Sequence, residues 1–457
     1  MNDQPRDVDV DVVVVGAGAG GLTAALAVAD SGRSVVVLEK LDHAGGNSAL
    51  STGSIPAAGS RQQREAGVDD DPDRMATDLL RQSGAHQAEH LTRRLAEISA
   101  ELVDWLVDQH GVGLRLITDY KHVGHSVTRL HAPSSRRGTD LVNDLLAACE
   151  RAGVDVLIGN PVTALLKDEG RICGVVVEGE RTERYELRSH AVILASNGFG
   201  NSPAMIERWV PELAEVEYFG AIGSTGEALE WGLDVGGYLQ NQGAYQGYAA
   251  VAYPHGSILS WTTVEKGAVV VDATGRRLGD ESIGYSGFTV EVQRGEAPVH
   301  VVYDTRIKEL ASKEEEFAEL VEMGGAREYD DVAALADGIG ADADGLAETL
   351  AQYASAAGGS ASDPFGRQDF GLAPLAPPYV ASRVTPGLFH TQGGLAVDDD
   401  GRVLTAPGSA VPGLFAVGGV AVGISGQHGG RGYSSGNGLL TAVGLGRLAG
   451  LAAGSTL

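Results

Sequence analysis

The first forty residues pass from an apolar run through a glycine cluster into two further apolar runs. Val10–Val15 is β-branched and almost continuously apolar, which predicts a strand buried on both faces. Leu22–Ala29 is rich in Ala and Leu and predicts a helix. Ser34–Leu38 predicts a second strand, which ends at Glu39. The order strand, turn, helix, strand predicts a βαβ unit with parallel strands.

The following residues continue this style. Apolar spacing predicts two helices over 72–112 and a third over 139–152, while 41–58 reads as loop. Strands are predicted at Val154–Ile158, Ile172–Glu178 and Ala191–Ala195. Near the C-terminus, Val411–Gly418 predicts a strand entering a glycine turn, and Gly438–Ala452 a closing helix. An α/β domain with a Rossmann-like parallel sheet is therefore expected.

The middle of the chain has a different pattern. Tyrosines become frequent after about residue 238, and Ile307–Met323 forms a helical block rich in Lys and Glu. We therefore expect two domains. Residues 1–238 and 389–457 build one domain, and an α+β domain of residues 239–388 is inserted into it.

Composition and charge narrow the possible partners. Hydrophobic residues make up 43% of the 457 residues, enough for a large core. The net charge of −27 argues against nucleic acid and anionic membrane surfaces. Cys149 and Cys173 lack metal-ligand spacing, so we expect no metal site. The acidic N-terminus does not read as a signal peptide, and a cytoplasmic protein is expected.

The turn after the first strand carries the first chemistry. Gly16, Gly18 and Gly21 follow the GxGxxG pattern between a strand and a helix, with Glu39 18 positions after Gly21 at a strand end. Gly16 makes the tight turn, Gly18 lets the backbone approach a pyrophosphate, and Gly21 permits close helix–strand packing. The helix N-terminus stabilises phosphate, and Glu39 can accept hydrogen bonds from ribose hydroxyls. A dinucleotide site is predicted.

At this point the chain resembles the fumarate reductase/succinate dehydrogenase flavoprotein family over nearly its whole length. The motifs that carry the resemblance, in chain order, are GAGAGG with Glu39, Gly45-Gly46-Asn47-Ser48 with Gly53, Ala195-Ser196-Asn197-Gly198-Phe199, Gly275–Glu281, Thr385–Gly394 and Gly413–Gly418. The resemblance implies FAD as the cofactor, bound by a two-part domain with a capping domain. It implies non-covalent FAD as well, because Asn47 stands near the position of the histidine that links FAD in membrane-bound relatives.

The resemblance also implies the residues that would hold FAD. They are Gly16, Gly18, Gly20, Gly21, Glu39, Lys40, Gly45, Gly46, Asn47, Ser48, Gly53, Ser196, Gly198, Gly418, Gly419, Asn437, Leu439 and Leu440. Gly419 departs from the family, whose members often have an acidic residue there. His390 and His428 are expected to be hydrogen-bonded residues of the flavin loops.

The substrate positions depart from the carboxylate-reducing members, which hold a dicarboxylate with two arginines and a histidine. Tyr285 stands at the position of their first arginine, four residues after Glu281. Tyr433 stands at the second, four residues before Asn437, and Phe389 replaces the histidine. All three ionic anchors are absent from these positions.

Tyrosine at both positions resembles the ketosteroid dehydrogenases and related cyclic-ketone dehydrogenases. In that branch Tyr285 would be the general base, and Tyr433 would donate to the substrate ketone, helped by a backbone N–H near Gly436. Ser435 as a proton relay and Tyr120 as a third tyrosine remain alternatives for part of this role. Tyr245 and Tyr248 are expected as pocket walls beside Phe389. Arg431 is either a solvated turn residue or the anchor for the carboxylate of a keto-acid.

These residues predict an FAD-dependent dehydrogenase that introduces a C=C bond next to the ketone of a 3-ketosteroid, a cyclohexanone-type ring or a keto-acid. Its partners would be this small molecule and an external electron acceptor, because the chain contains no CxxCH haem motif. Two alternatives stay open. One is an ene reductase of the fumarate or urocanate type, and the other is a redox-silent FAD-binding protein.

Overall fold

The structure is a computed structural model that describes residues 8–119, 121–179, 182–406 and 408–455. The chain divides into two compact units. Unit 1 comprises Met1–Pro211, Gly220–Tyr245 and His390–Leu457, and unit 2 comprises Glu212–Phe219 and Gln246–Phe389. The boundaries at 238/239 and 388/389 expected for independently folding domains stay a prediction.

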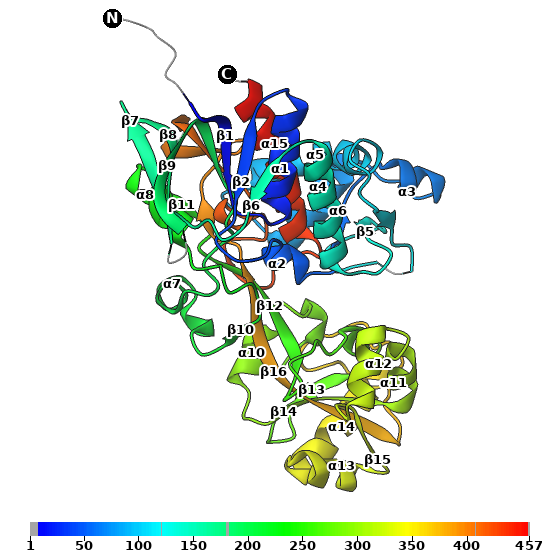
Figure 1. Cartoon of the computed structure of the whole chain (residues 1–457). Helices are drawn as coiled ribbons and strands as arrows, with labels where there is room; N and C mark the ends of the chain where they lie inside the picture. Colours follow the sequence, from blue (N-terminus) through cyan, green and yellow to red (C-terminus); the bar gives the residue numbers. More distant parts are fainter. Residues whose placement is uncertain (1–7, 120, 180–181, 407, 456–457) are drawn as a thin grey trace, which may run out of the picture. The chain divides into compact units, whose positions relative to one another are not determined.

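Unit 1 is built on an eight-stranded sheet whose main order is β18-β19-β9-β1-β2-β6 (Figure 1). Strand β1 (Val10–Val15) pairs in parallel with β2 (Val35–Leu38) and with β9 (Thr182–Leu194). The outer strands β6 (Asp155–Leu157) and β19 (Ser409–Ala416) are also parallel to their neighbours β2 and β9. The predicted α/β class with a Rossmann-like sheet is confirmed.

The other strands of the sheet are antiparallel. Strand β8 (Arg171–Gly179) pairs with β7 (Val162–Asp168) and with β9, and β18 (Arg402–Ala406) pairs with β19. The remaining elements of unit 1 are α2 Gly46–Ala49, β3 Ile55–Pro56, α3 Arg61–Glu65, α4 Pro72–Ser83, α5 Glu89–Asp108, β4 Arg115–Leu116, β5 Leu130–Ala132, α6 Gly138–Arg151, α7 Pro203–Trp209, α8 Glu227–Asp234, β11 Leu239–Gln240, β17 Gly394–Leu395, η3 Gly418–Val420 and β20 His428–Gly429.

Helices α1 (Ala19–Asp30) and α15 (Asn437–Ser455) lie side by side against this sheet, although 400 residues separate them (Figure 1). Glycines make the close approach possible. A Cβ at Gly446 would lie 2.5 Å from the carbonyl oxygen of Gly20, and one at Gly450 would lie 2.4 Å from that of Ala24. Within the described residues, α15 is the one helix long and apolar enough to cross a bilayer, and 72% of its apolar window is buried inside the structure.

Unit 2 contains a smaller, mostly antiparallel sheet covered by helices. Strand β14 (Val299–Asp304) pairs antiparallel with β13 (Val269–Val271) and with β16 (Tyr379–Thr391). Strand β16 also pairs with β15 (Arg327–Tyr329) and β10 (Glu217–Tyr218). The chain enters unit 2 first at Glu212–Phe219 and again within β12 (Gly243–Ala252), and it leaves the unit within β16. The other elements are α9 Thr262–Glu265, η2 Glu281–Ile283, α10 Thr289–Arg294, α11 Thr305–Ala311, α12 Glu315–Glu322, α13 Val332–Ile339 and α14 Ala343–Ala357.

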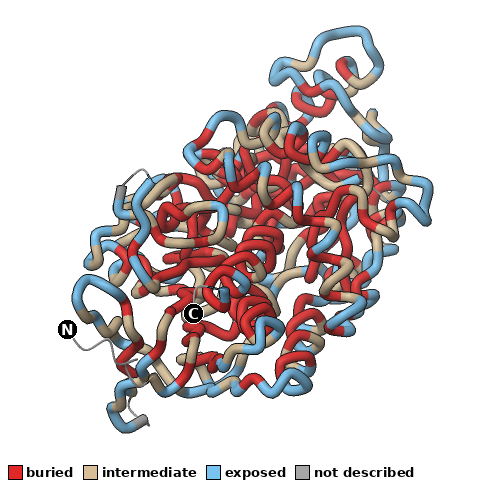
Figure 2. The backbone as a smooth tube through the Cα atoms, turned by 90° about the horizontal axis from the view of Figure 1, so that it is seen from above, coloured by how far each residue is buried: buried red, intermediate tan, exposed pale blue. Residues whose placement is uncertain are grey.

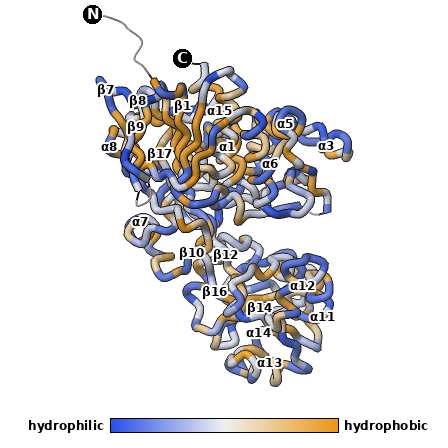
Figure 3. Tube along the Cα trace, in the orientation of Figure 1, coloured by the Kyte–Doolittle hydropathy of each residue, from blue (hydrophilic) through white to orange (hydrophobic). Residues whose placement is uncertain are grey.

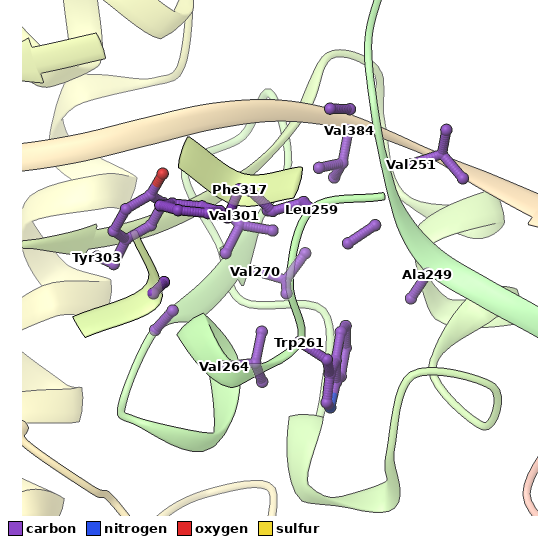
Figure 4. Close-up of a cluster of buried hydrophobic side chains, with 14 of the residues drawn as sticks. Ala249, Val251, Leu259, Trp261, Val264, Val270, Val301, Tyr303, Phe317 and Val384 are labelled. Carbon is purple, nitrogen blue, oxygen red and sulfur yellow. The ribbon is translucent and has the colours of Figure 1, made fainter. Parts of the chain in front are cut away.

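The two faces of the unit 2 sheet belong to two separate cores. Because successive strand residues point to opposite faces, Val301 and Tyr303 of β14 join one cluster while Val302 joins the other. Figure 4 shows the first cluster, in which Trp261, Phe317 and Leu259 gather on Val301 and Val270. Figure 2 shows the buried stretches along the tube, and Figure 3 shows the hydrophobic ones, among them β1.

Most predicted elements are present within two or three residues of their expected bounds. The block Ile307–Met323 is helical as expected, but it is divided into two helices, since α11 ends at Ala311 and α12 begins after Glu314. Residues 41–58 were expected to be loop, yet they contain the single turn α2 and the short strand β3. Strand β9 also begins nine residues before the expected Ala191, at Thr182.

Candidate active site

The turn after β1 is fixed by contacts that only glycine allows. Gly16 has φ +110°, and a Cβ there would lie 2.6 Å from the carbonyl oxygen of Ala195. A Cβ at Gly21 would lie 2.0 Å from the carbonyl oxygen of Gly16. The backbone of 16–21 is thus packed against β9 on one side and against its own turn on the other.

The helix that follows this turn starts beside a second glycine loop. Gly18 is the N-cap of α1, and the nearest atom to a Cβ at Gly18 is 3.6 Å away, so this position is less tightly packed than Gly16 or Gly21. The loop of Gly45, Gly46 and Ser48 crosses this N-terminus, where the Ser48 hydroxyl accepts a hydrogen bond from Ala19 N at 3.1 Å. The other backbone N–H groups of a helix start suit a pyrophosphate.

Glu39 lies at the end of β2, where its carboxylate is oriented by the backbone. It accepts hydrogen bonds from Ala17 N and Leu41 N, both at 2.9 Å. The neighbouring Lys40 donates to Thr225 at 2.7 Å and to Glu227 at 2.8 Å, so its ammonium group attaches the start of α8 to the end of β2. Glu39 is therefore held at the strand end where a ribose would lie in a dinucleotide site.

A second group of predicted cofactor residues gathers where β9 and β19 end. Ser196 follows Ala195 directly, and Asn197 adopts φ +69° and donates to Ser224 at 2.7 Å. A Cβ at Gly198 would lie 2.2 Å from the Thr391 hydroxyl, and one at Gly419 would lie 2.3 Å from Asn197 Oδ1. The strand ends are thus packed so closely that neither glycine position has room for a side chain.

His390 is in the same region. Its ring lies 2.8 Å from where a Cβ of Gly419 would be and 3.6 Å from one at Gly438. Burial lowers its pKa to about 4, so the imidazole is neutral at pH 7. His428, on β20, instead packs against Gly243 of β12.

Buried polar atoms without partners surround the start of α15. Among the described residues, Asn437 Oδ1 and both amide atoms of Gln392 are buried and make no hydrogen bond. Asn437 Nδ2 donates to Ser425 at 3.2 Å, while Leu439 and Leu440 are buried on the same helix. Such orphaned groups cost free energy unless a ligand satisfies them. Together with the helix N-terminus at Gly18, they fit FAD.

Two further positions complete the predicted FAD set. Gly53 has φ +68°, and a Cβ there would lie 2.9 Å from Pro133. Asn47 Oδ1 accepts a hydrogen bond from Ala221 N at 2.6 Å. The amide of Asn47 is therefore tied to the backbone of unit 1.

Tyr433 lies on a tightly packed loop that leads into α15. It is 6% exposed, and its neighbour Ser435 donates its backbone N–H to the carbonyl of Val123 at 3.0 Å. The ring of His125 contacts the carbonyl of Ser435 at 2.9 Å, so Nε2 must carry the proton and donate. Gly436 has φ +83°, and a Cβ there would lie 2.7 Å from Pro56.

A buried ion network stands behind this loop. Arg129 is fully buried and forms a bidentate pair with Asp70 at 2.7 Å and a contact with Asp78 at 2.6 Å. Burial alone would raise the pKa of Asp78, but hydrogen bonds from Ser126 and Arg129 lower it to about 2. Burial lowers the pKa of His125 to about 4, which keeps it a neutral donor beside Arg129. The network fixes the ring that holds the Tyr433 loop.

In unit 2, Tyr285 follows a turn that is anchored by Glu281. This carboxylate is fully buried and accepts hydrogen bonds from Arg277 at 2.6 Å and from Arg367 at 3.2 Å. Arg277 also pairs with the buried carboxylate of Asp363. The carbonyl of Tyr285 accepts from Ala249 N at 3.0 Å, which attaches the residue to β12.

The Tyr285 ring belongs to an aromatic stack. Its centroid lies 5.0 Å from that of Tyr248, which in turn stacks on Phe389 at 5.4 Å and 18°. The Tyr248 hydroxyl donates to the carbonyl of Leu259 at 3.0 Å, and burial followed by repulsion from Tyr285 raises its pKa well above the usual value. Tyr248 is thus a neutral wall, and the structure brings together three predicted substrate-side residues.

The positions of the remaining predicted substrate-site residues say little about their roles. Tyr245 is 1% exposed and lies in unit 1. Arg431 is exposed, and its carbonyl accepts from Gln82 at 2.8 Å. Tyr120 lies outside the described residues. Sequence reasoning missed Gln392 and His125, although Gln392 stands where the family motif has Met.

Comparisons with known proteins agree with this cofactor site. A family model described as an FAD-binding domain matches residues 11–439. The chain belongs to this flavoprotein family. A probable fumarate reductase of Shewanella frigidimarina, Ifc3, is 29% identical over 94% of this chain and 72% of its own length. A 4-oxocyclohex-2-ene-1-carboxylate 5-dehydrogenase of Sinomonas cyclohexanicum is 26% identical over 91% of this chain and 89% of its own length.

A solved structure shows the same fold. The 3-ketosteroid-Δ4-(5α)-dehydrogenase of Rhodococcus jostii matches 99% of this chain and 98% of its own, with a TM-score of 0.79 and 24% identity. The predicted membership in the fumarate reductase/succinate dehydrogenase-type family is confirmed.

The ion cluster at Glu281 leads to a stability prediction. Glu281→Ala leaves two buried guanidinium groups without their shared carboxylate, so the free energy of unfolding should fall by about 3–5 kcal/mol. Arg276→Ala is the matched control, because Arg276 pairs with Glu348 at 3.3 Å on the surface. It should change the free energy by less than about 0.5 kcal/mol. Urea unfolding of both variants measures this, and equal losses would contradict the assignment.

Proposed function

We propose that this protein is an FAD-dependent dehydrogenase that introduces a C=C bond next to the ketone of a cyclic ketone, either a 3-ketosteroid or a cyclohexanone-type ring. At the level of the family, the chain is an FAD-dependent oxidoreductase acting on CH–CH groups. The substrate class is the finer part of the proposal.

The observation that carries the proposal is the stack of Tyr285, Tyr248 and Phe389 in unit 2. Two of its members stand at positions where the carboxylate-reducing relatives have an arginine and a histidine. Aromatic rings cannot neutralise the second carboxylate of a dicarboxylate, and burying an unpaired carboxylate costs about 5 kcal/mol. A neutral ring with one ketone needs only one or two hydrogen-bond donors.

The chemistry divides between the two tyrosines. Tyr285 takes the proton from the carbon next to the ketone, and the C–H electron pair becomes the C=C bond of an enolate. Tyr433 donates its hydroxyl proton as a hydrogen bond to the ketone oxygen, where the negative charge develops. FAD, when bound, would supply the acceptor for the hydride that leaves the β-carbon as the enolate electron pair forms the new C=C bond.

The residues around each tyrosine keep it in place for this role. The Glu281 cluster fixes the turn before Tyr285, and the His125 contact fixes the loop that carries Tyr433. Gly436 and the N-terminus of α15 add backbone donors near Tyr433. Ser435 and Tyr120 stay alternative carriers of the abstracted proton.

A second candidate function keeps specific support. The identity to a fumarate reductase favours an ene reductase that runs the same chemistry in the opposite direction. Arg431 is exposed and has no ion pair among the described residues, so it is available to a carboxylate. One relative is named for a substrate that carries both a ring ketone and a carboxylate. If the substrate of this chain is such a keto-acid, Arg431 would bind its carboxylate.

The proposal extends to the partners. We expect an external electron acceptor and a cytoplasmic location, and the net charge of −27 supports a protein that avoids nucleic acid and anionic membranes.

We also propose that FAD is bound without a covalent link. Asn47 carries a carboxamide, which has no nucleophilic ring nitrogen, and its oxygen already accepts from Ala221 N. Acid precipitation of the yellow holoenzyme should therefore release the flavin into the supernatant, where its absorbance is measured. Flavin that stays with the precipitated polypeptide would contradict this assignment.

Removal of the two phenol groups tests the catalytic roles. Tyr285→Phe should slow anaerobic flavin reduction by a saturated cyclic ketone at least ~10²-fold, the usual scale for loss of a general base, with little change in ketone binding. Tyr433→Phe should weaken binding and slow reduction, because an oxyanion donor contributes about 2.7–4 kcal/mol in the transition state. Stopped-flow absorbance at varied ketone concentration separates the two effects.

Tyr303→Phe is the matched control, because Tyr303 is a buried phenol of the same unit that hydrogen-bonds Ser382 at 2.8 Å. Its reduction rate should equal that of the wild type. A near-normal rate in Tyr285→Phe would move the base role to Ser435 or Tyr120.

A further inference from the structure

A cavity of about 270 Å³ lies within unit 2 and shares no residue with the proposed active site. Its lining includes Tyr253, His300, Arg327, Tyr329, Ala381 and Arg383. Its size is just below the range of ~300–1,000 Å³ typical of small-molecule sites.

The pairing of strands β14, β15 and β16 explains why these residues line one cavity (Figure 1). His300 of β14 is directly opposite Arg383 of β16, and Arg327 of β15 is opposite Ala381. Ala381 and Arg383 are two residues apart, so all four residues share one face of the sheet. Arg327 and Arg383 are therefore diagonal neighbours in the sheet, and the small Ala381 side chain lies between their positions.

The charge of this cavity is opposite to that of the chain. Its lining contains no Asp or Glu, although the whole chain carries a net charge of −27. In the described part of the chain, neither Arg327 nor Arg383 has a carboxylate within ion-pair distance. Glu328, the acid next to Arg327, pairs instead with Lys308 at 2.8 Å. Two neighbouring cations without a counter-ion attract an anion.

The cavity also has fixed polar and aromatic walls. His300 is only 8% exposed, and burial followed by the charge of Arg383 lowers its pKa to about 4, so it is a neutral hydrogen-bonding group at pH 7. The Arg383 guanidinium lies 4.4 Å from the ring centroid of Tyr253, and this ring is 49% exposed. The Tyr329 ring lies against Gly338, where a Cβ would be 2.1 Å away. The pocket therefore offers a cationic end and flat rings.

We propose that this pocket binds a small molecule with a phosphate or carboxylate group on a flat ring, up to about the size of a nucleoside monophosphate. Arg327 and Arg383 bind the oxyanion, because planar guanidinium forks match phosphate and carboxylate geometry. His300 adds a neutral hydrogen bond, and the ring of the ligand lies against Tyr253 or Tyr329. The site is separate from flavin chemistry and is independent of the proposed function.

Isothermal titration calorimetry on the FAD-loaded enzyme tests this site, since bound FAD occupies the adenosine site of unit 1. The probes are AMP, adenosine, inorganic phosphate and 4-hydroxybenzoate. We expect AMP or 4-hydroxybenzoate to bind at least ~10-fold more tightly than adenosine, because hydrogen bonds between charged groups increase the affinity by at least this factor. The tighter of the two anions identifies phosphate or carboxylate as the preferred group.

Charge-matched variants locate the binding. Arg327→Gln and Arg383→Gln, on different strands, should each weaken the anion at least ~10-fold. Arg294→Gln removes the same charge from an exposed position of unit 2 outside the cavity and should leave affinity unchanged. The proposal would be overturned if no probe binds. It would also be overturned if adenosine and AMP bind equally well and 4-hydroxybenzoate does not bind, or if Arg294→Gln loses as much affinity for the anion as the two cavity variants.

Discussion

The close approach of backbones through glycine is the constraint on which unit 1 depends. Gly16 packs against the carbonyl of Ala195, the residue that follows β9, and Gly446 and Gly450 bring α15 onto the backbone of α1. A single methyl group at any of these sites would have to displace backbone, which cannot move without separating the strand and helix ends. The same contacts place the starts of both helices beside the loops at Gly45 and Gly419, so the cofactor residues gather from segments 400 residues apart.

Each of the two proposed catalytic tyrosines has a buried ion network behind it. In unit 1, Arg129, Asp70 and Asp78 hold His125, whose ring holds the Ser435 carbonyl. In unit 2, Glu281 joins Arg277 and Arg367 at the turn before Tyr285. Buried ion pairs add little to net stability, because desolvation offsets the attraction. Their value here is geometric, because they restrict loops that would otherwise sample several conformations.

The sequence predicted the parts whose signals are local. Val10–Val15, the glycine turn and Glu39 stand within thirty residues of one another, and their order alone indicates a dinucleotide fold. The spacing from Glu281 to Tyr285 likewise needs no tertiary information. The Arg129 network could not be predicted, because Asp70 and Asp78 are 59 and 51 residues away and nothing local marks them as partners. The division of 307–323 into two helices was missed because Glu314, after which the second helix begins, looks like an ordinary member of a charged run.

The central claim is that the substrate is a cyclic ketone and not a dicarboxylate. The most direct measurement is anaerobic mixing of the oxidised holoenzyme with cyclohexanone, a saturated 3-ketosteroid, 4-oxocyclohexanecarboxylate or succinate, while the flavin absorbance is followed. The account predicts bleaching of the flavin by at least one of the ketones and none by succinate. Bleaching by succinate at a rate comparable with the best ketone would contradict it, as would reoxidation of the reduced enzyme by fumarate as fast as by the matching cyclic enone.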